Sequence, residues 1–159
     1  MTRGTLRAIG KAARNDRGNV ATLTAFAVVP LVILAAGVIN FGFVWAMRND
    51  LQFTADAASL AGASQLGDDA QVLAKANEFA ENNMAAANHG DVLVDADIEI
   101  CFWDKTTRVF TAGGTPENAV RATKRRASEN NNALPSILGD FIGRDDWDLS
   151  MQAIAALRT

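Results

Sequence analysis

The sequence contains no tyrosine, one cysteine and one histidine. One cysteine and one histidine cannot supply the four ligands of a structural zinc site, and a lone cysteine has no partner for an intramolecular disulfide. We expect Cys101 to be a buried apolar side chain, and His89, beside Gly90, to lie at a solvated helix end. No Ser/His/Asp, Cys/His or paired-carboxylate arrangement can be assembled. These absences favour a protein that is not an enzyme and uses no metal or cofactor.

Charged residues are also absent from Gly18 to Met47, a stretch of thirty residues. As a helix, this stretch would be about 45 Å long, against about 30 Å for the hydrocarbon core of a bilayer. Phe41, Phe43 and Trp45 lie near its end, where amphipathic rings favour the membrane–water interface. The sequence therefore predicts a transmembrane helix over residues 18–47.

The apolar stretch has two other interpretations, a cleaved signal peptide and a buried core helix. A cleaved signal peptide could end at "LAAGV" (Leu34–Val38), but the apolar run continues nine residues beyond it. A buried core helix of this length would need a much larger domain around it. A secreted soluble binding domain with a cleaved signal remains the alternative from a different class of protein.

The charges are divided unevenly along the chain. Residues 1–17 contain five Lys or Arg and one Asp, whereas residues 18–159 contain ten basic and seventeen acidic residues. Basic flanks stay in the cytoplasm, so we expect a cytoplasmic segment at 1–17 and an extracytoplasmic domain at 48–159. The acidic domain repels phosphates, which argues against a nucleic-acid partner.

Beyond the apolar stretch, the period of apolar residues predicts two helices followed by strands. The first helix continues from the membrane through about 48–66; Gly67 ends it, and Asp68 caps a second helix at 68–88. Alternating residues then predict strands within a sheet region at about 92–158. The expected strands cover Val92–Trp103, Val109–Thr111, Ala119–Arg125 and Trp147–Leu157, with a short helix from Pro135 to Phe141. The predicted fold class is α+β, a small antiparallel sheet against the helices.

Clustered charges raise two questions about binding. Asp95, Asp97 and Glu99 would share one face of a strand, and such carboxylates could hold calcium; a solvated sheet face is the simpler interpretation. The basic run Lys124–Arg126 stands in an acidic domain, where pairing with nearby carboxylates or docking of a partner is expected.

Small residues recur at helical spacing on both sides of the predicted membrane boundary. Gly42 and Ala46, and again Ala58 and Gly62, repeat the small-xxx-small spacing that lets another helix approach closely. For the second pair, the partner is either the second helix of this chain or another protein; for the first pair, the chain offers no partner, which favours self-association of the membrane helix. The candidate packing residues are Gly42, Ala46, Leu51, Gln52, Ala55, Asp56, Ala58 and Gly62.

The order of these features resembles a known family. Arg17-Gly18, Pro30, "GVIN" at Gly37–Asn40, then Arg48, Leu51-Gln52 and "ADAA" at Ala55–Ala58 are similar to the N-terminal segment of the TadE/TadG-like pilus-assembly proteins of tight-adherence (Tad, Flp-type) secretion systems. The resemblance covers about residues 17–66. It implies a pilin-like architecture and a single span in a prokaryotic inner membrane. The implied partners are the membrane and other pilus-assembly or pilin subunits.

Two departures from the family pattern distinguish its possible roles. Asn40 stands where an acidic residue is common. Leu23 stands five residues after Gly18, where pilins trimmed by a prepilin peptidase carry glutamate. The second departure favours an uncut membrane anchor over the alternative, a minor pilin that is trimmed and enters the fibre.

Overall fold

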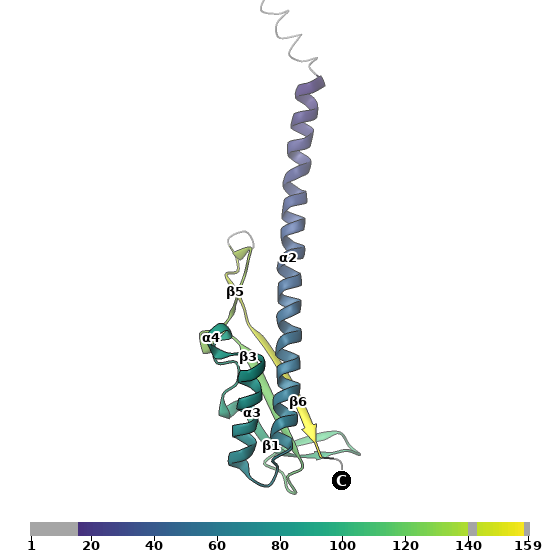
Figure 1. Ribbon diagram of the computed structural model, residues 1–159. Helices are drawn as coiled ribbons and strands as arrows, with labels where there is room; N and C mark the ends of the chain where they lie inside the picture. Colours follow the sequence, from purple (N-terminus) through teal and green to yellow (C-terminus); the bar gives the residue numbers. More distant parts are fainter. Residues whose placement is uncertain (1–15, 140–142, 158–159) are drawn as a thin grey trace, which may run out of the picture. The chain divides into compact units, whose positions relative to one another are not determined.

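The computed structural model describes residues 16–139 and 143–157, with side chains from Val20 onward. The predicted basic segment, residues 1–17, therefore lies almost wholly outside the described residues. The chain divides into two compact units, with the boundary between Ile39 and Asn40. One helix, α2 (Asp16–Ala63), contains this boundary (Figure 1).

The first part of α2 is the apolar segment. From Val20 onward, α2 is long and apolar enough to cross a membrane, and it is the one such helix in the described part of the chain. Its large side chains are exposed, including Leu23, Phe26 and Leu34. Pro30 lies inside the helix, which membrane helices tolerate although proline removes a backbone donor. The expected long N-terminal apolar helix is confirmed.

A tight turn joins α2 to the second helix, α3 (Asp69–Asn83). Gly67 has a φ of +107°, a conformation that favours glycine. The side chain of Asp68 then accepts a hydrogen bond of 3.2 Å from the backbone N–H of Gln71, as an N-cap does. The helix ends at Asn83, short of the predicted residue 88, because Met84 leaves the helical conformation. A separate short helix, α4, covers Ala86–His89.

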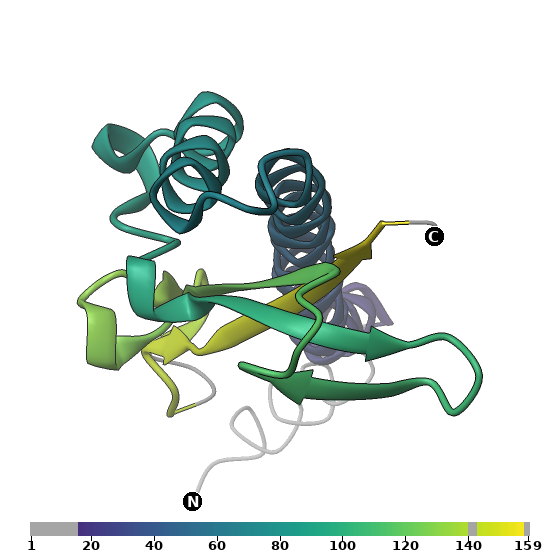
Figure 2. The ribbon, with the colours of Figure 1, turned by 90° about the horizontal axis from the view of Figure 1, so that it is seen from below.

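The main sheet has four antiparallel strands in the order β2-β1-β3-β6. Their bounds are β1 (Ile98–Asp104), β2 (Val109–Ala112), β3 (Ala119–Arg126) and β6 (Leu149–Ala156). In Figure 2, α2 and α3 lie over the same face of this sheet. The α+β class and the antiparallel sheet are therefore confirmed.

Three local expectations were wrong. The single strand predicted over Trp147–Leu157 is divided: Trp147 belongs to β5 (Asp146–Trp147), and β6 begins at Leu149. The strand predicted from Val92 begins only at Ile98, because Asp95–Asp97 forms a 3-10 helix, η1. Pro135 does not open a helix: it belongs to β4 (Leu134–Pro135), which pairs with β5 (Asp146–Trp147). The end of the predicted helix, at residues 140–142, lies outside the described residues.

The strands β4 and β5 form a second, two-stranded sheet that we call the arm, residues 134–139 and 143–147. The backbone N–H of Ser136 donates to the Asp145 carbonyl oxygen at 2.8 Å, and that of Arg144 donates to Gly139 at 3.2 Å. These bonds continue the pairing beyond the two strands. The arm is drawn in Figure 1 with the label β5.

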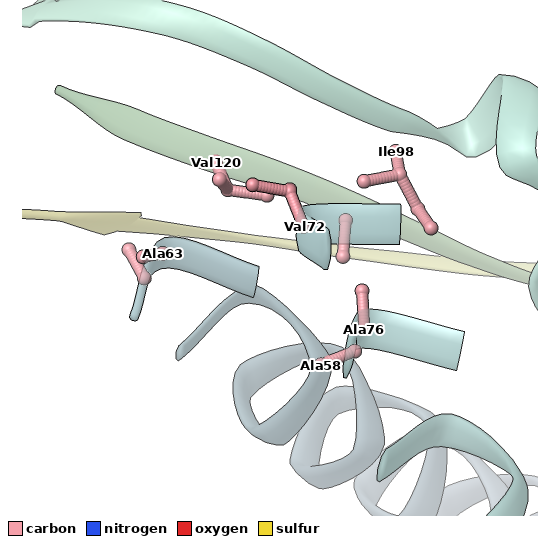
Figure 3. Close-up of a cluster of buried hydrophobic side chains, with 8 residues drawn as sticks. Ala58, Ala63, Val72, Ala76, Ile98 and Val120 are labelled. Carbon is pink, nitrogen blue, oxygen red and sulfur yellow. The ribbon is translucent and has the colours of Figure 1, made fainter. Parts of the chain in front are cut away.

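The core lies between the two helices and the sheet. One cluster joins α2, α3 and the strands. Figure 3 shows Val72 of α3 pointing toward Val120 of β3, and Ala58 of α2 beside Ala76 of α3. A second cluster brings together Met47, Leu51, Met84, Val92, Leu134 and Leu149. Leu134 belongs to the arm, so the arm is packed into the same core. The last third of α2 is therefore an internal element of the domain.

Replacing Ala58 by leucine should destabilise the domain by about 1–3 kcal/mol, because three further carbons would have to fit into a packed cluster. Ala58 is fully buried. The measurement is urea denaturation of the full chain in detergent micelles, followed by tryptophan fluorescence. Leu60→Ala is the control: Leu60 is 65% exposed, and its loss should change the free energy of unfolding by less than about 0.5 kcal/mol. Equal stability of Ala58→Leu and the wild type would contradict close packing at this position.

Candidate interaction site on the long helix

Half of the eight candidate packing residues are covered by the chain itself. Leu51, Ala55 and Ala58 have no exposed surface. At Gly62, an added Cβ would lie 3.2 Å from Cγ1 of Val120 and 3.3 Å from Cγ1 of Val72. The small residues on this side of α2 therefore admit the sheet and α3, and this face is not available to another protein.

The other four candidates are not in the core. Gly42 and Ala46 are exposed, and no side chain or distant backbone lies within 4 Å of where a Gly42 Cβ would be. Gln52 donates from Nε2 to Asp56 Oδ1 at 3.1 Å and to the backbone oxygen of Gln152 at 3.3 Å. Gln52 thus ties α2 to the edge strand β6, while Asp56 remains exposed.

The structure adds two residues that the sequence analysis did not single out. Phe53 and Leu60 are each 65% exposed, although they lie on the part of α2 that belongs to the domain. They follow Ala46 at intervals of seven residues, which is close to two turns of an α-helix. Gly42, Ala46, Phe53 and Leu60 therefore lie along one side of α2, opposite the buried residues; we call this set the outer stripe. The seven-residue interval was the sequence signal for it.

The acidic residues considered for calcium have separate partners. The carboxylate of Asp95 accepts a hydrogen bond of 2.7 Å from Asn77 Nδ2, and Asp97 pairs with Arg125 at 3.0 Å. Glu99 pairs with Arg121 on the neighbouring strand. Among the described residues, no group of three His, Cys, Asp or Glu could hold a metal ion. The expected common face is not formed because η1 interrupts the strand.

Cys101 and His89 differ in their surroundings. Cys101 is buried, its Sγ donates to the Ala119 carbonyl oxygen at 3.1 Å, and burial raises the pKa of its thiol to about 11. The prediction of a buried side chain at Cys101 is confirmed. His89 lies at the end of α4, where it is half-buried, and its Nδ1 has no hydrogen-bond partner among the described residues.

Lys124 differs from Arg125 in the basic run Lys124–Arg126, a difference that the sequence does not show. Arg125 pairs with Asp97 at 3.0 Å and with Glu129 at 3.2 Å. Lys124, by contrast, faces the helices from β3 and is fully buried, and its Nζ has no hydrogen-bond partner in the described part of the chain. Burial lowers the pKa of Lys124 to about 8, although the nearby carboxylate of Glu81 opposes the shift. An ammonium in this place costs stability.

Comparison with known protein families gives two matches. The profile of the Flp pilus-assembly TadE/G-like family matches residues 18–65, and that of the Tad-like Flp pilus-assembly family matches residues 55–155. No curated protein and no solved structure matches the chain in these comparisons. The resemblance found in the sequence is confirmed, and the second match extends it over the sheet.

Replacing Lys124 by methionine should stabilise the domain at pH 7, because the shift of its pKa from 10.5 to about 8 corresponds to on the order of 3 kcal/mol. In the wild type, both states are charged below about pH 8. Between about pH 8 and 10.5, the unfolded chain binds the proton more tightly than the folded domain does. Stability should therefore rise with pH through this window, and Lys124→Met should lose that rise. Urea denaturation in micelles at several pH values measures both effects.

Lys75→Met is the matched control for this experiment. The side chain of Lys75 is 40% exposed and pairs with Glu78 within α3 at 2.7 Å, so its loss should change stability by less than about 0.5 kcal/mol. A Lys124→Met variant less stable than the wild type at pH 7 would show that the ammonium has a stabilising partner.

Proposed function

Because the chain belongs to the Tad-like family of Flp pilus-assembly proteins, we propose that it is a non-enzymatic, membrane-anchored component of this machinery. The family assignment places the chain in Flp pilus assembly. The proposal adds that it acts by packing against other subunits, with the apolar first part of α2 in the inner membrane and the domain in the periplasm. The observation that carries it is the outer stripe, a line of exposed apolar residues on α2. The opposite side of this part of α2 is packed into the core.

The anchoring is supported by α2 and by the charges that flank it. The exposed apolar side chains from Val20 onward would be unfavourable in water, and a bilayer would cover them. Five basic residues lie before the apolar segment, and Arg48 is the first charge after it. This asymmetry favours a cytoplasmic N-terminus.

The non-enzymatic role is supported by what the reactive side chains do. Three of the carboxylates that could have bound a metal are neutralised by, or hydrogen-bonded to, Asn77, Arg121 and Arg125. The thiol of Cys101 is buried and its pKa is raised, so little of it is a nucleophilic thiolate at neutral pH. The hydrogen bonds, ion pairs and burial of these groups therefore contribute to the folded structure.

Contact with other subunits is supported by the outer stripe. Phe53 and Leu60 lie among small or polar neighbours, so a second helix can lie along α2 with its side chains between them. The same line passes through Gly42 and Ala46, whose lack of bulk permits close approach of helices. A helix of another pilus subunit, or of a second copy, fits this surface.

Truncating both large side chains of the stripe, Phe53→Ala with Leu60→Ala, should leave the domain folded and abolish pilus formation. Both side chains are exposed, so stability should change by less than about 0.5 kcal/mol per substitution. Co-purification of pilus subunits and electron microscopy of cells measure assembly. The control is the pair Val109→Ala with Ile154→Ala, which removes exposed apolar side chains from the sheet. Normal pili in the stripe variant would contradict the packing role.

The mass and location of the native protein should separate the anchor from its two alternatives. The anchor should fractionate with the inner membrane and retain residues 1–17, because Leu23 replaces the glutamate that accompanies trimming. Loss of about eighteen residues, with recovery in the fibre, would instead identify a minor pilin. Loss of about thirty-six, with recovery in the soluble fraction, would identify a secreted domain. Intact-mass spectrometry of each fraction measures the outcome.

A further inference from the structure

Asn40 joins α2 to the arm at the end of the apolar segment. Although Asn40 lies within the uncharged stretch, it is only 6% exposed. Its Oδ1 accepts a hydrogen bond of 3.2 Å from the backbone N–H of Ile137, and its Nδ2 donates to Ser136 Oγ at 3.5 Å. The arm therefore reaches α2 at the first residue of the folded unit.

A membrane span that begins at Val20 would place Asn40 near the edge of a bilayer. Val20 to Ile39 are twenty residues, which rise about 30 Å in a helix, the thickness of a hydrocarbon core. The helix needs no residue beyond Ile39 to span it. A bilayer that covers Val20–Ile39 ends next to Asn40 in the sequence, and Asn40 is hydrogen-bonded to Ile137 of the arm.

The side chains around this level are of the kinds found at membrane interfaces. Phe41 and Trp45 are exposed on α2, with ring centroids 6.3 Å apart. On the arm, Ile137 is 56% exposed, although its backbone N–H donates a hydrogen bond to Asn40. The guanidinium of Arg144 lies 4.5 Å from the centre of the Trp147 ring. Aromatic, aliphatic and basic groups are enriched where hydrocarbon meets headgroups.

We propose that the arm is a second membrane contact, in which Ile137 enters the interfacial layer of the outer leaflet. The occupant of this surface is the lipid bilayer. Arg144 and Asp145 are adjacent and exposed with opposite charges, so the contact is apolar and does not depend on anionic lipid. Asp146 and Asp148 accept hydrogen bonds from Ser128, on the side of the domain body. The proposal rests on the membrane anchoring in the proposed function, and it makes Asn40 the residue that holds the arm at the lipid surface.

The test uses the full chain in phosphatidylcholine nanodiscs, with a fluorescent bimane probe on single introduced cysteines. The probes replace Ile137 on the arm, Val29 in the apolar segment and Thr106 in the turn between β1 and β2, far from the arm (Figure 1). Because Cys101 is buried, the labelled wild type gives the background. Lipids with a nitroxide near the headgroup or deep in the acyl chain quench the probe according to its depth.

We expect strong quenching of the Val29 probe by the deep nitroxide. The Ile137 probe should be quenched by the shallow nitroxide several-fold more than the Thr106 probe, with or without anionic lipid. If Val29 is quenched but Ile137 no more than Thr106, the arm does not touch lipid and the anchor stands. If Val29 is not quenched either, both the anchor and the arm contact are wrong.

Substitution of Asn40 tests its part in the proposal. Asn40→Leu removes the hydrogen bonds to Ser136 and Ile137 and should lose most of the shallow quenching at Ile137, while the Val29 probe is unchanged. Asn40→Asp keeps an oxygen for the Ile137 N–H and should retain the quenching. Equal quenching in both variants would overturn the role of Asn40 in holding the arm.

Discussion

The close approach of α2 to the sheet and α3 is the constraint on which the domain depends. At Gly62 there is no room for an unhindered Cβ, since two valine methyl groups lie within 3.3 Å of its place. Fully buried Ala58 and Ala55 continue the same face one and two turns before Gly62. A bulky side chain at these positions would separate the helix from both layers. The alanine-rich sequence after the apolar segment is therefore a condition for the core, because the domain is built around α2.

This packing explains how far the fold could be predicted. Periodicity identifies long α2 and the strands β3 and β6, because their apolar residues recur without interruption. It fails at Val92–Asp97, where the alternation continues but the backbone does not: the Val92 carbonyl accepts from the Arg125 N–H at 2.9 Å, and the chain then turns through η1. At Pro135, the preference of proline for the first turn of a helix predicts a helix. The chain instead forms β4, which pairs with β5. Such pairings join distant residues, which a local pattern does not contain.

The small residues of α2 do not by themselves specify which partner covers them. Their spacing indicates a helix that another element can approach closely, and it fits an internal or an external partner equally well. The structure assigns Ala58 to the core and leaves Phe53 exposed. At Lys124, two sequence signals disagree. The alternation of β3 places Lys124 on the buried face with Val120 and Ala122, whereas its charge predicts that the side chain is exposed to solvent. Burial of the neighbouring residues outweighed the cost of one ammonium, a balance that only tertiary packing decides.

The three surfaces of α2 together restrict what kind of partner can bind. The first twenty apolar residues are available to lipid, one side of the last third is core, and the outer stripe is free. Because Gly42 and Ala46 lie on the same line as Phe53 and Leu60, a partner in contact with one pair can follow α2 to the other without changing faces. A globular surface would have difficulty following this narrow line, since Asn49 and Asp56 lie beside the apolar positions. Under the proposed function, a second helix that leaves the membrane next to α2 would meet this condition.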